Sequence, residues 1–511
     1  MSNNVSSAPL LNYLNNYGND GKNRRISGDE IHQLITRKYS RVSDLIPNNS
    51  NVAIVEPLII ERKPLIYEKL LQFINEFDLF RDFGISYGER VSIILPNGPE
   101  LAVCLISVIN RWCAAPINPT STPLEIKHEL ESTKSKAIII IANTSNDFFI
   151  EIAKTLNIGV IVLTPSGSTS GLFSLSSLID VPVNNVNKSN VNKNLILLLH
   201  TSGTSGNKKL VPYTVDMVIV GVACIISSWN LSPSDVCLNM MPLFHIGGIM
   251  RNILSPILSG GSVICCSGFD PVLFWDVLYE HRVTWYYAAP TMHHAILQQV
   301  ESRPKPLPVD SVRFIANAAG GLLPILAETL QKEFDCIILT SYGMTECMPI
   351  SSPSQEYRLR PIGTSGLPVG PEVIIAIDND DGKFKPCATM EPGNIFVRNY
   401  PCFTGYENDE AANAESFATI NKKKYFNTGD VGYLDAEGHS LTHLRTHSLT
   451  HSLTHSKDTC LYLVDPRKLS IEVVKQFLLL KLKKQLFNTQ ISKIVWHSRL
   501  DIKNFRRQSV L

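Results

Sequence analysis

Short apolar runs alternate with longer amphipathic stretches over most of the chain, and this alternation limits the fold more than any other feature. The runs are short, typical of strands and bounded by turn residues: Val91–Leu95, Ala137–Ile141, Gly159–Leu163 and Leu195–Leu199. Stretches with helical periodicity, such as Leu124–Ser132, lie between them. Strands that alternate with helices predict an α/β protein with largely parallel sheets. A chain of 511 residues is too long for one compact core, so we expect two or more domains.

The composition is that of an ordinary globular protein, with 44% hydrophobic and 18% charged residues. A formal net charge of +1 gives no reason to expect nucleic acid as a partner. The first residues lack the basic region and long apolar core of a signal peptide. The longest apolar run, Met217–Ile226, is too short to cross a bilayer and predicts a buried helix. Eleven cysteines without a C-x-x-C pair indicate free thiols in a reducing compartment, so we expect a cytoplasmic protein.

The segment Leu195–Lys209, LILLLHTSGTSGNKK, predicts a site for a phosphate group. A buried strand runs into a loop of threonine, serine and glycine that ends in two lysines. Glycines let the backbone curl so that successive N–H groups point at an anion, while hydroxyls and a lysine add donors and charge. The alternative is a plain surface turn. The segment lacks the G-x-x-x-x-G-K-[ST] pattern of a Walker A loop and the G-x-S-x-G pattern of a serine hydrolase.

This loop resembles the phosphate-binding signature of the adenylate-forming superfamily, which includes acyl-CoA synthetases, adenylation domains of peptide synthetases and luciferases. The signature usually reads T-S-G-[ST]-T-G-x-P-K-G, so Lys209 matches its lysine. Lys208 stands where proline is usual, and Leu210 where glycine is usual. The resemblance implies that the loop residues bind the nucleotide: Thr201, Ser202, Gly203, Thr204, Ser205 and Gly206.

Three further segments occur in the family's order and spacing. Ser341–Glu346, SYGMTE, is similar to the motif in which an aromatic ring stacks on adenine. Asn317–Leu323, NAAGGLL, resembles the turn that packs against adenine, and Asn427–Asp435, NTGDVGYLD, resembles the segment whose aspartate binds the ribose hydroxyls. One carboxylate accepts two hydrogen bonds, which suits a vicinal diol. The matched residues expected to bind nucleotide are Gly320, Gly321, Leu322, Ser341, Tyr342, Gly343 and Asp430.

The same match implies catalytic roles for Lys209, Thr345 and Glu346, with Thr345 at the phosphate and Glu346 holding Mg²⁺, a cation that favours carboxylate oxygen. Met241–Ile246, MPLFHI, and Trp285–His293, WYYAAPTMH, look like segments that line the acyl pocket of acid–CoA ligases. By that resemblance His245 borders the substrate carboxylate and is a fourth catalytic residue; a lone histidine there is otherwise an ordinary core residue.

The resemblance implies an AMP-forming acid–CoA ligase for a small or medium carboxylic acid, with ATP, Mg²⁺ and CoA as cofactor and co-substrates. The chain carries Phe244-His245 where peptide-synthetase adenylation domains usually place F-D, which argues against an amino acid substrate. Adenylation domains that load a carboxylic acid onto a carrier remain an alternative. The fold implied is a large N-terminal AMP-binding domain of several α/β subdomains, followed in the family by a small C-terminal α+β domain.

The sequence changes character at His439, where a four-residue unit, Thr-His-Ser-Leu, begins to repeat, and no glycine follows up to Leu511. We recognise neither the family's hinge motif nor its C-terminal domain beyond this point. The expected domains are an N-terminal extension (1–56), the AMP-binding domain (57–438), the repeat (439–456) and a tail in place of the C-terminal domain (457–511).

Two explanations of the repeat compete. Histidines at every fourth position form a stripe that could bind metal, whereas a translated tetranucleotide repeat would mean that reading entered a non-native stretch. We favour the second explanation, in which the gene or its model is disrupted. A catalytically decayed nucleotide-binding protein is therefore the rival to an active ligase. The end, Ser-Val-Leu, lacks the basic residue of a peroxisomal Ser-Lys-Leu address, so a peroxisomal location requires that a native address has been lost.

Overall fold

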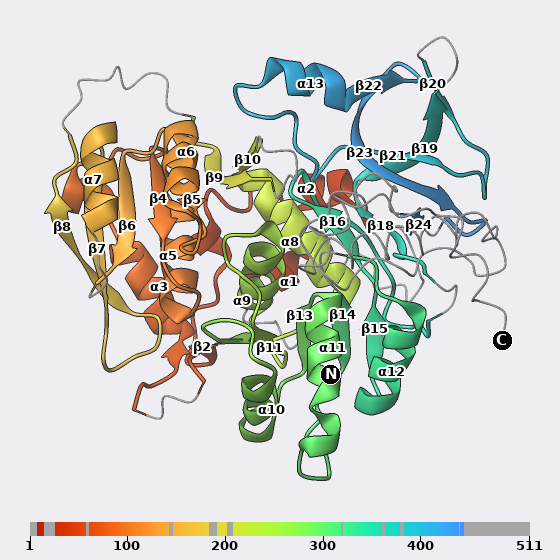
Figure 1. Cartoon of the computed structure of the whole chain (residues 1–511), viewed down its shortest axis with the longest axis horizontal. Coiled ribbons are helices and arrows are strands. Elements are labelled where there is room, and N and C mark those ends of the chain that lie inside the picture. The colour runs from red at the N-terminus through yellow and green to blue at the C-terminus, as the bar shows by residue number, and fades with distance from the viewer. Residues whose placement is uncertain are drawn as a thin grey trace, which may run out of the picture. The chain divides into compact units, whose positions relative to one another are not determined.

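The computed structural model describes residues 8–14, 26–57, 61–142, 147–182, 192–201, 208–317, 320–359, 363–378, 383–438 and 440–443. All of these residues belong to one compact unit that comprises residues 1–457. Residues 458–511 form the other unit, and like the loop 202–207 they lie outside the described residues. Two mostly parallel sheets and two mostly antiparallel sheets make up the described part (Figure 1).

The first parallel sheet has the strand order β10-β9-β5-β4-β6-β7-β8, in which only the two outer strands run antiparallel to their neighbours. Its strands are β4 (Arg90–Ile94), β5 (Cys113–Pro116), β6 (Ala137–Ile141), β7 (Gly159–Pro165), β8 (Phe173–Ile179), β9 (Leu195–His200) and β10 (Leu210–Thr214). The helices around it are α3 (Tyr67–Glu76), α5 (Pro99–Ile109), α6 (Pro123–Thr133) and α7 (Asp147–Leu156), drawn in orange and yellow in Figure 1.

The second parallel sheet has the order β15-β14-β13-β11-β12-β2-β3, with β3 antiparallel to β2. Its strands are β2 (Val52–Val55), β3 (Leu65–Ile66), β11 (Val236–Asn239), β12 (Ser262–Cys265), β13 (Trp285–Ala288), β14 (Phe314–Asn317) and β15 (Ile337–Leu339). Helices α10 (Pro271–Glu280), α11 (Pro290–Gln298) and α12 (Pro324–Phe334) pack in series beside it (Figure 1). Other short helices include α4 (Leu79–Phe83), η1 (Val42–Leu45) and η4 (Val300–Ser302).

Two smaller sheets follow in the second half of the chain. One has the order β1-β18-β17-β16 and is built from β1 (Ile26–Ser27), β16 (Tyr342–Met344), β17 (Cys347–Ser352) and β18 (Leu367–Gly370). The other contains β19 (Glu372–Asp378), β20 (Phe384–Pro386), β21 (Gly393–Arg398), β22 (Phe417–Ile420), β23 (Lys423–Leu434) and β24 (Ser440–His443), beside α13 (Glu410–Ser416). This sheet is blue and teal in Figure 1.

Helix α8 (Val215–Trp229) occupies the core, as its run of apolar residues predicts. It packs on α2 (Gly28–Ile35), on α9 (Ser255–Leu258), on the π-helix η3 (Gly248–Leu254) and on strands β17 and β18, and α1 (Pro9–Leu14) touches it as well. A Cβ on Gly221 would lie 2.5 Å from the carbonyl oxygen of Met348, so this glycine is what permits the helix to approach β17 closely.

The predicted α/β class is confirmed, and each of the four predicted strands forms within one or two residues of its expected bounds, as β4, β6, β7 and β9. The two antiparallel sheets were not foreseen. The domain boundaries stay predictions, although α2 and β2 precede residue 57 and β24 falls within the repeat. Among the described residues no helix is both long and apolar enough to cross a membrane. The ten described cysteines are free, and nine of them are buried.

Candidate nucleotide-binding site

The predicted phosphate loop connects two paired strands, β9 and β10. The N–H of Thr201 donates to the carbonyl of Lys209 over 2.9 Å, and the N–H of Lys209 donates to Oγ1 of Thr201 over 3.1 Å. These two bonds close the base of the loop and fix where Lys209 leaves the sheet. The predicted contacts Ser202, Gly203, Thr204, Ser205 and Gly206 lie outside the described residues.

Thr345 and Glu346 form the turn between β16 and β17, and Tyr342 begins β16. The hydroxyl of Tyr213, on β10, donates a hydrogen bond to the carbonyl of Thr345. This bond ties the turn to the strand that follows the phosphate loop. Two segments more than 100 residues apart in sequence are therefore held at one place.

Lys209 and Glu346 meet through an aromatic residue, Tyr406. The hydroxyl of Tyr406 donates to Oε1 of Glu346 over 2.6 Å, and Nζ of Lys209 lies 4.7 Å from the centroid of the same ring. Burial raises the pKa of Glu346, and the hydrogen bond from Tyr406 opposes that rise. The sequence analysis did not single out Tyr406, because its segment carries no pattern typical of phosphate binding. Its importance follows from contacts 60 residues away.

Tyr342 and Asp430 form a second pair. The hydroxyl of Tyr342 donates to Oδ2 of Asp430 over 2.6 Å. Burial raises the pKa of Asp430, whereas the hydrogen bond from Tyr342 lowers it. The residues that the family resemblance assigns to adenine and to ribose are thus in direct contact.

The carboxyl ends of β14 and β15 meet at one edge of the second sheet, as parallel neighbours must. The hydroxyl of Ser341, just after β15, donates to the carbonyl of Asn317 over 3.2 Å. The side-chain amide of Asn317 donates to the carbonyl of Gly320 over 2.6 Å. Gly321 follows exposed, and Leu322 is buried. The predicted adenine turn therefore lies next to Ser341 and Tyr342.

The far end of the phosphate loop is anchored to α6 by an ion pair. Nζ of Lys208 lies 2.6 Å from Oε1 of Glu129, whose side chain is only 6% exposed. His200, before the loop, shares a 2.7 Å hydrogen bond with Ser132 on the same helix. Burial, and after it the charge of Lys208, lower the pKa of His200 to about 4, so Lys208 is the cation that neutralises Glu129 at neutral pH.

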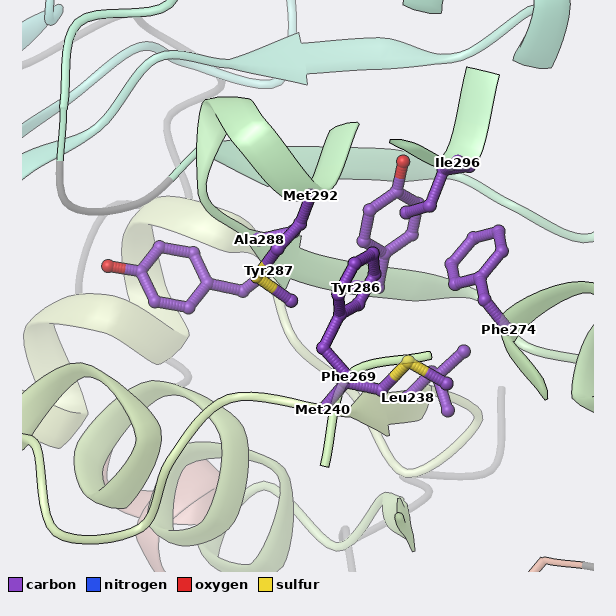
Figure 2. Close-up of a pocket in the computed structure, with 9 residues that line it drawn as sticks. All are labelled: Leu238, Met240, Phe269, Phe274, Tyr286, Tyr287, Ala288, Met292 and Ile296. Atoms are coloured by element: carbon purple, nitrogen blue, oxygen red, sulfur yellow. The ribbon is translucent and has the colours of Figure 1, made fainter. Parts of the chain in front are cut away.

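The first predicted acyl-binding segment follows β11 and the second contains the neighbouring strand β13, and a small cavity lies beside the second segment. This cavity, about 10 Å³, has room for about one water molecule and is lined by Tyr286, Ala288 and Met292 together with residues of β11 and α10 (Figure 2). The ring of Tyr287 points away from this group (Figure 2). It instead lies 4.8 Å from the guanidinium of Arg251, on the other face of β13.

His245 belongs to the first acyl segment and precedes η3. The side chain is exposed, but desolvation by the protein around it, and after it the positive charge of Lys208, lower the pKa of its imidazole. The imidazole therefore favours its neutral form. The cation that contributes to this is Lys208, which also anchors the phosphate loop.

Comparisons with known proteins show the family of the chain. Residues 53–407 match the family of AMP-binding enzymes. An oxalate–CoA ligase of Saccharomyces cerevisiae is 29% identical over 440 residues, which cover 78% of this chain and 76% of that protein. An oxalate–CoA ligase of Arabidopsis thaliana is 31% identical over 370 residues, which cover 71% of this chain and 70% of that protein.

The fold also matches solved structures. Apo MatB from Rhodopseudomonas palustris superposes with a TM-score of 0.65 at 21% identity, covering 79% of this chain and 78% of that chain. At this identity the match supports the fold alone. The match over residues 53–407 and the CoA ligase relatives show that the chain belongs to the AMP-binding enzymes, the adenylate-forming superfamily, and resembles the acid–CoA ligases among them.

Proposed function

We propose that this chain activates a small or medium carboxylic acid with ATP and transfers the acyl group to CoA. Two sets of contacts carry the proposal. Tyr406 contacts both Lys209 and Glu346, and Tyr342, the residue expected to stack on adenine, donates a hydrogen bond to Asp430. Phosphate, metal and ribose contacts are thus available together. The relatives named oxalate–CoA ligases favour a small acid.

In the proposed reaction, a carboxylate oxygen of the acid attacks the α-phosphorus of ATP and the bond to the β-phosphate breaks, releasing pyrophosphate. The sulfur of CoA then attacks the acyl carbon, its proton goes to solvent, and AMP leaves. No covalent bond to the protein is needed, so the residues contribute positioning and charge neutralisation. Lys209 neutralises developing negative charge, Thr345 donates to phosphate, and His245 borders the acid.

The nucleotide is held by its adenine and its ribose in this proposal. The ring of Tyr342 stacks on the base beside Gly320 and Gly321, and Asp430 accepts hydrogen bonds from both ribose hydroxyls. Thr201 and the loop from Ser202 to Gly206 supply further donors to phosphate.

The residues present fit Mg²⁺ carried with the phosphates. The described residues contain no group of three or more His, Cys, Asp or Glu that would cage a metal alone. Mg²⁺ does not require one, because it commonly takes one or two carboxylates besides phosphate oxygens and water. Glu346 would supply that carboxylate, and the ion would neutralise phosphate charge.

Pyrophosphate exchange tests the function. We expect the purified chain to incorporate labelled pyrophosphate into ATP in the presence of an acid from a panel of small carboxylic acids. If no acid supported exchange, but the chain bound ATP and Asp430→Ala abolished that binding, the result would instead support a decayed nucleotide-binding protein. Exchange without thioester formation from CoA would favour transfer to a carrier.

The C-terminal region and the location of the protein belong to the same proposal. We infer that residues 439–511 are a non-native stretch in place of the family's C-terminal domain, and that exchange is accordingly slow. Sequencing the transcript across Leu434–Cys460 tests this: an uninterrupted message with these codons contradicts a gene-model error. We further propose a cytoplasmic location, and imaging of the endogenous protein would reveal a peroxisomal one instead.

A further inference from the structure

A short connecting segment, residues 403–407, joins the two parts of the candidate site that carry its lysine and its metal-binding carboxylate. The first N–H of the segment, on Phe403, donates to the carbonyl of Glu346 over 2.9 Å. The last N–H, on Glu407, donates over 2.9 Å to the carbonyl of Leu210, the residue after the site lysine. Both ends of the segment are therefore bonded to main chain that belongs to, or adjoins, a residue expected to act on phosphate or metal.

Within the connecting segment, Tyr406 is held in place by Asn413 of α13. The N–H of Tyr406 donates to Oδ1 of Asn413 over 2.7 Å, and its carbonyl accepts from Nδ2 over 2.9 Å. A Cβ on Gly405 would lie 2.9 Å from the same Oδ1, so a side chain there would press on the atom that holds Tyr406. The ring of Tyr406 packs edge-on against Phe403, with the centroids 4.8 Å apart. The position of the ring is therefore set by the segment and α13 and does not require a bound ligand.

Tyr406 contacts a cation and a carboxylate that do not pair with each other. Nζ of Lys209 lies 4.7 Å from the centroid of its ring, and its hydroxyl donates to Oε1 of Glu346 over 2.6 Å. Within the part of the chain that the structure describes, no carboxylate lies within 4 Å of Nζ of Lys209, whereas the neighbouring Lys208 pairs with Glu129 over 2.6 Å. The ring has no net charge, so the cation–π contact stabilises the lysine without cancelling its charge.

We propose that Tyr406 is a positioning residue for adenylation, which keeps Lys209 and Glu346 from pairing with each other so that the lysine acts on the phosphates and the carboxylate on the metal ion. The inference rests on the proposed function and adds a residue to its site. A direct ion pair in a buried site is strong, and ATP would have to break it before either charge became available.

The hydroxyl of Tyr406 has a second effect, which is to orient the carboxylate of Glu346. An ionised carboxylate offers about four acceptor positions, so one hydrogen bond to Oε1 fixes its direction and leaves the others for a metal ion. Donors that orient a metal-binding side chain in this way typically change metal affinity by about 10- to 100-fold when they are removed.

The gain in affinity that Mg²⁺ gives to a bound triphosphate tests the role of the hydroxyl without turnover. Calorimetry on the full chain would measure the Kd of α,β-methylene-ATP with EDTA and with saturating Mg²⁺, and the ratio of the two values is the gain. Tyr406→Phe keeps the ring beside Lys209, so the metal-free Kd should change by no more than about 3-fold, as expected for one neutral donor. The gain should fall by about 10-fold or more. A gain of the same size in both proteins would mean that the hydroxyl only supports the fold, and the inference would be wrong.

Two controls accompany this measurement. Tyr425→Phe removes a hydroxyl of the same kind from a different carboxylate, Glu372, and it should leave the gain unchanged. Adenosine has no phosphate and carries no metal, so its binding shows that each variant is folded.

A double-mutant cycle tests the separation of the two charges. With Tyr406 in place, Lys209→Met and Glu346→Gln should change the metal-free Kd independently, so that their effects combine to within about 2-fold. Tyr406→Leu removes the ring and lets Lys209 reach Glu346, so in that background the two effects should depart from additivity by about 5-fold or more. Coupling of equal size in the two backgrounds, or strong coupling with Tyr406 in place, would overturn the inference. If Tyr406→Leu no longer binds adenosine, the cycle with Tyr406 in place and the Tyr406→Phe measurement decide.

The two proposals fail in different ways. A chain whose Mg²⁺ gain depends on the hydroxyl of Tyr406, but which shows no pyrophosphate exchange with any acid, keeps the positioning role and loses the ligase function. A chain that exchanges pyrophosphate, but whose Mg²⁺ gain is the same in Tyr406→Phe, keeps the function and loses the positioning role.

Discussion

The hydroxyl of Tyr342 donates a 2.6 Å hydrogen bond to Asp430, although 88 residues separate the two in the sequence. One lies at the start of β16 and the other within the long strand β23, in different sheets. The bond therefore fixes the position proposed for adenine relative to the position proposed for ribose. Because a carboxylate accepts more than two hydrogen bonds, Asp430 can keep this bond while it accepts the ribose hydroxyls.

The ring and the hydroxyl of Tyr342 should contribute differently to nucleotide binding. Tyr342→Phe keeps the ring and should change adenosine affinity by no more than about 3-fold, as expected for one neutral donor. Tyr342→Ala also removes the stacking surface and should weaken binding by about 10-fold or more. Calorimetry with adenosine measures both, and equal losses in the two variants would show that the ring does not stack on the base.

Adenosine binding should also weaken in acid because of Asp430. Burial raises the pKa of this carboxyl above the usual 3.8, and only the ionised form accepts from both ribose hydroxyls. Affinity should stay constant above the raised pKa and fall as the pH drops through it. In Tyr342→Phe the bond that lowers this pKa is gone, so the fall should begin at a higher pH.

Asp430→Asn is the control for that profile. It has no carboxyl to titrate, so its adenosine affinity should be lower at neutral pH and nearly independent of pH. A wild-type profile as flat as that of the variant would mean that Asp430 does not bind the ribose.

The sequence predicted those parts of the fold and site that local pattern determines. Leu195–Lys209 combines a buried strand with a hydroxyl- and glycine-rich loop, and Ala137–Ile141 is recognisable from its composition alone. The antiparallel strands β19 to β23 were missed. Asn421 and Lys422, which form the tight turn between β22 and β23, both have positive φ, but this pair lacks the Asn-Gly or Asp-Gly sequence that marks a hairpin. These strands nevertheless form the sheet that positions Asp430.

Residues whose roles come from distant contacts were also missed. Nothing near Tyr406 in the sequence indicates that its hydroxyl reaches Glu346, and nothing near Glu407 indicates that its N–H reaches Leu210. Both facts depend on how separate sheets and helices pack. A pattern read along the chain contains no information on that packing.

Removing the hydroxyl of Tyr406 should destabilise the fold. Tyr406→Phe removes the side-chain donor from the carboxylate of Glu346, a residue that is 6% exposed, and we expect the free energy of unfolding to fall by about 1–3 kcal/mol. Urea denaturation measures the change. Tyr425→Phe is the matched control, since Tyr425 donates over 2.7 Å to Glu372. The side chain of Glu372 is 29% exposed, and in this variant it keeps its ion pair with Arg398.

In Tyr425→Phe the free energy of unfolding should fall by less, about 0.5–1 kcal/mol, because water can replace the lost donor at Glu372. If the two variants lost the same amount, the burial of Glu346 would not be what makes Tyr406 important.

The ion pair between Lys208 and Glu129 should matter more than an ordinary surface pair. Lys208→Ala removes the cation from a carboxylate that is 6% exposed, at one end of the phosphate loop. The buried carboxylate keeps His200, whose Nδ1 lies 3.5 Å from Oε2, but loses its permanent cation, so we expect the free energy of unfolding to fall by about 2 kcal/mol. Urea denaturation again gives the value, and adenosine binding, which does not use the phosphate loop, checks that the fold is intact.

Helix α6 supplies its own control for this prediction. Lys127 faces Glu131 across 4.0 Å on the same helix, with both side chains more than 40% exposed, and Lys127→Ala should cost less than about 0.5 kcal/mol. Loss of the anchor at the loop should also weaken ATP binding several-fold in Lys208→Ala but not in Lys127→Ala. Equal effects of the two substitutions on stability and on ATP affinity would mean that Glu129 needs no cation, and that the loop is held by its strands alone.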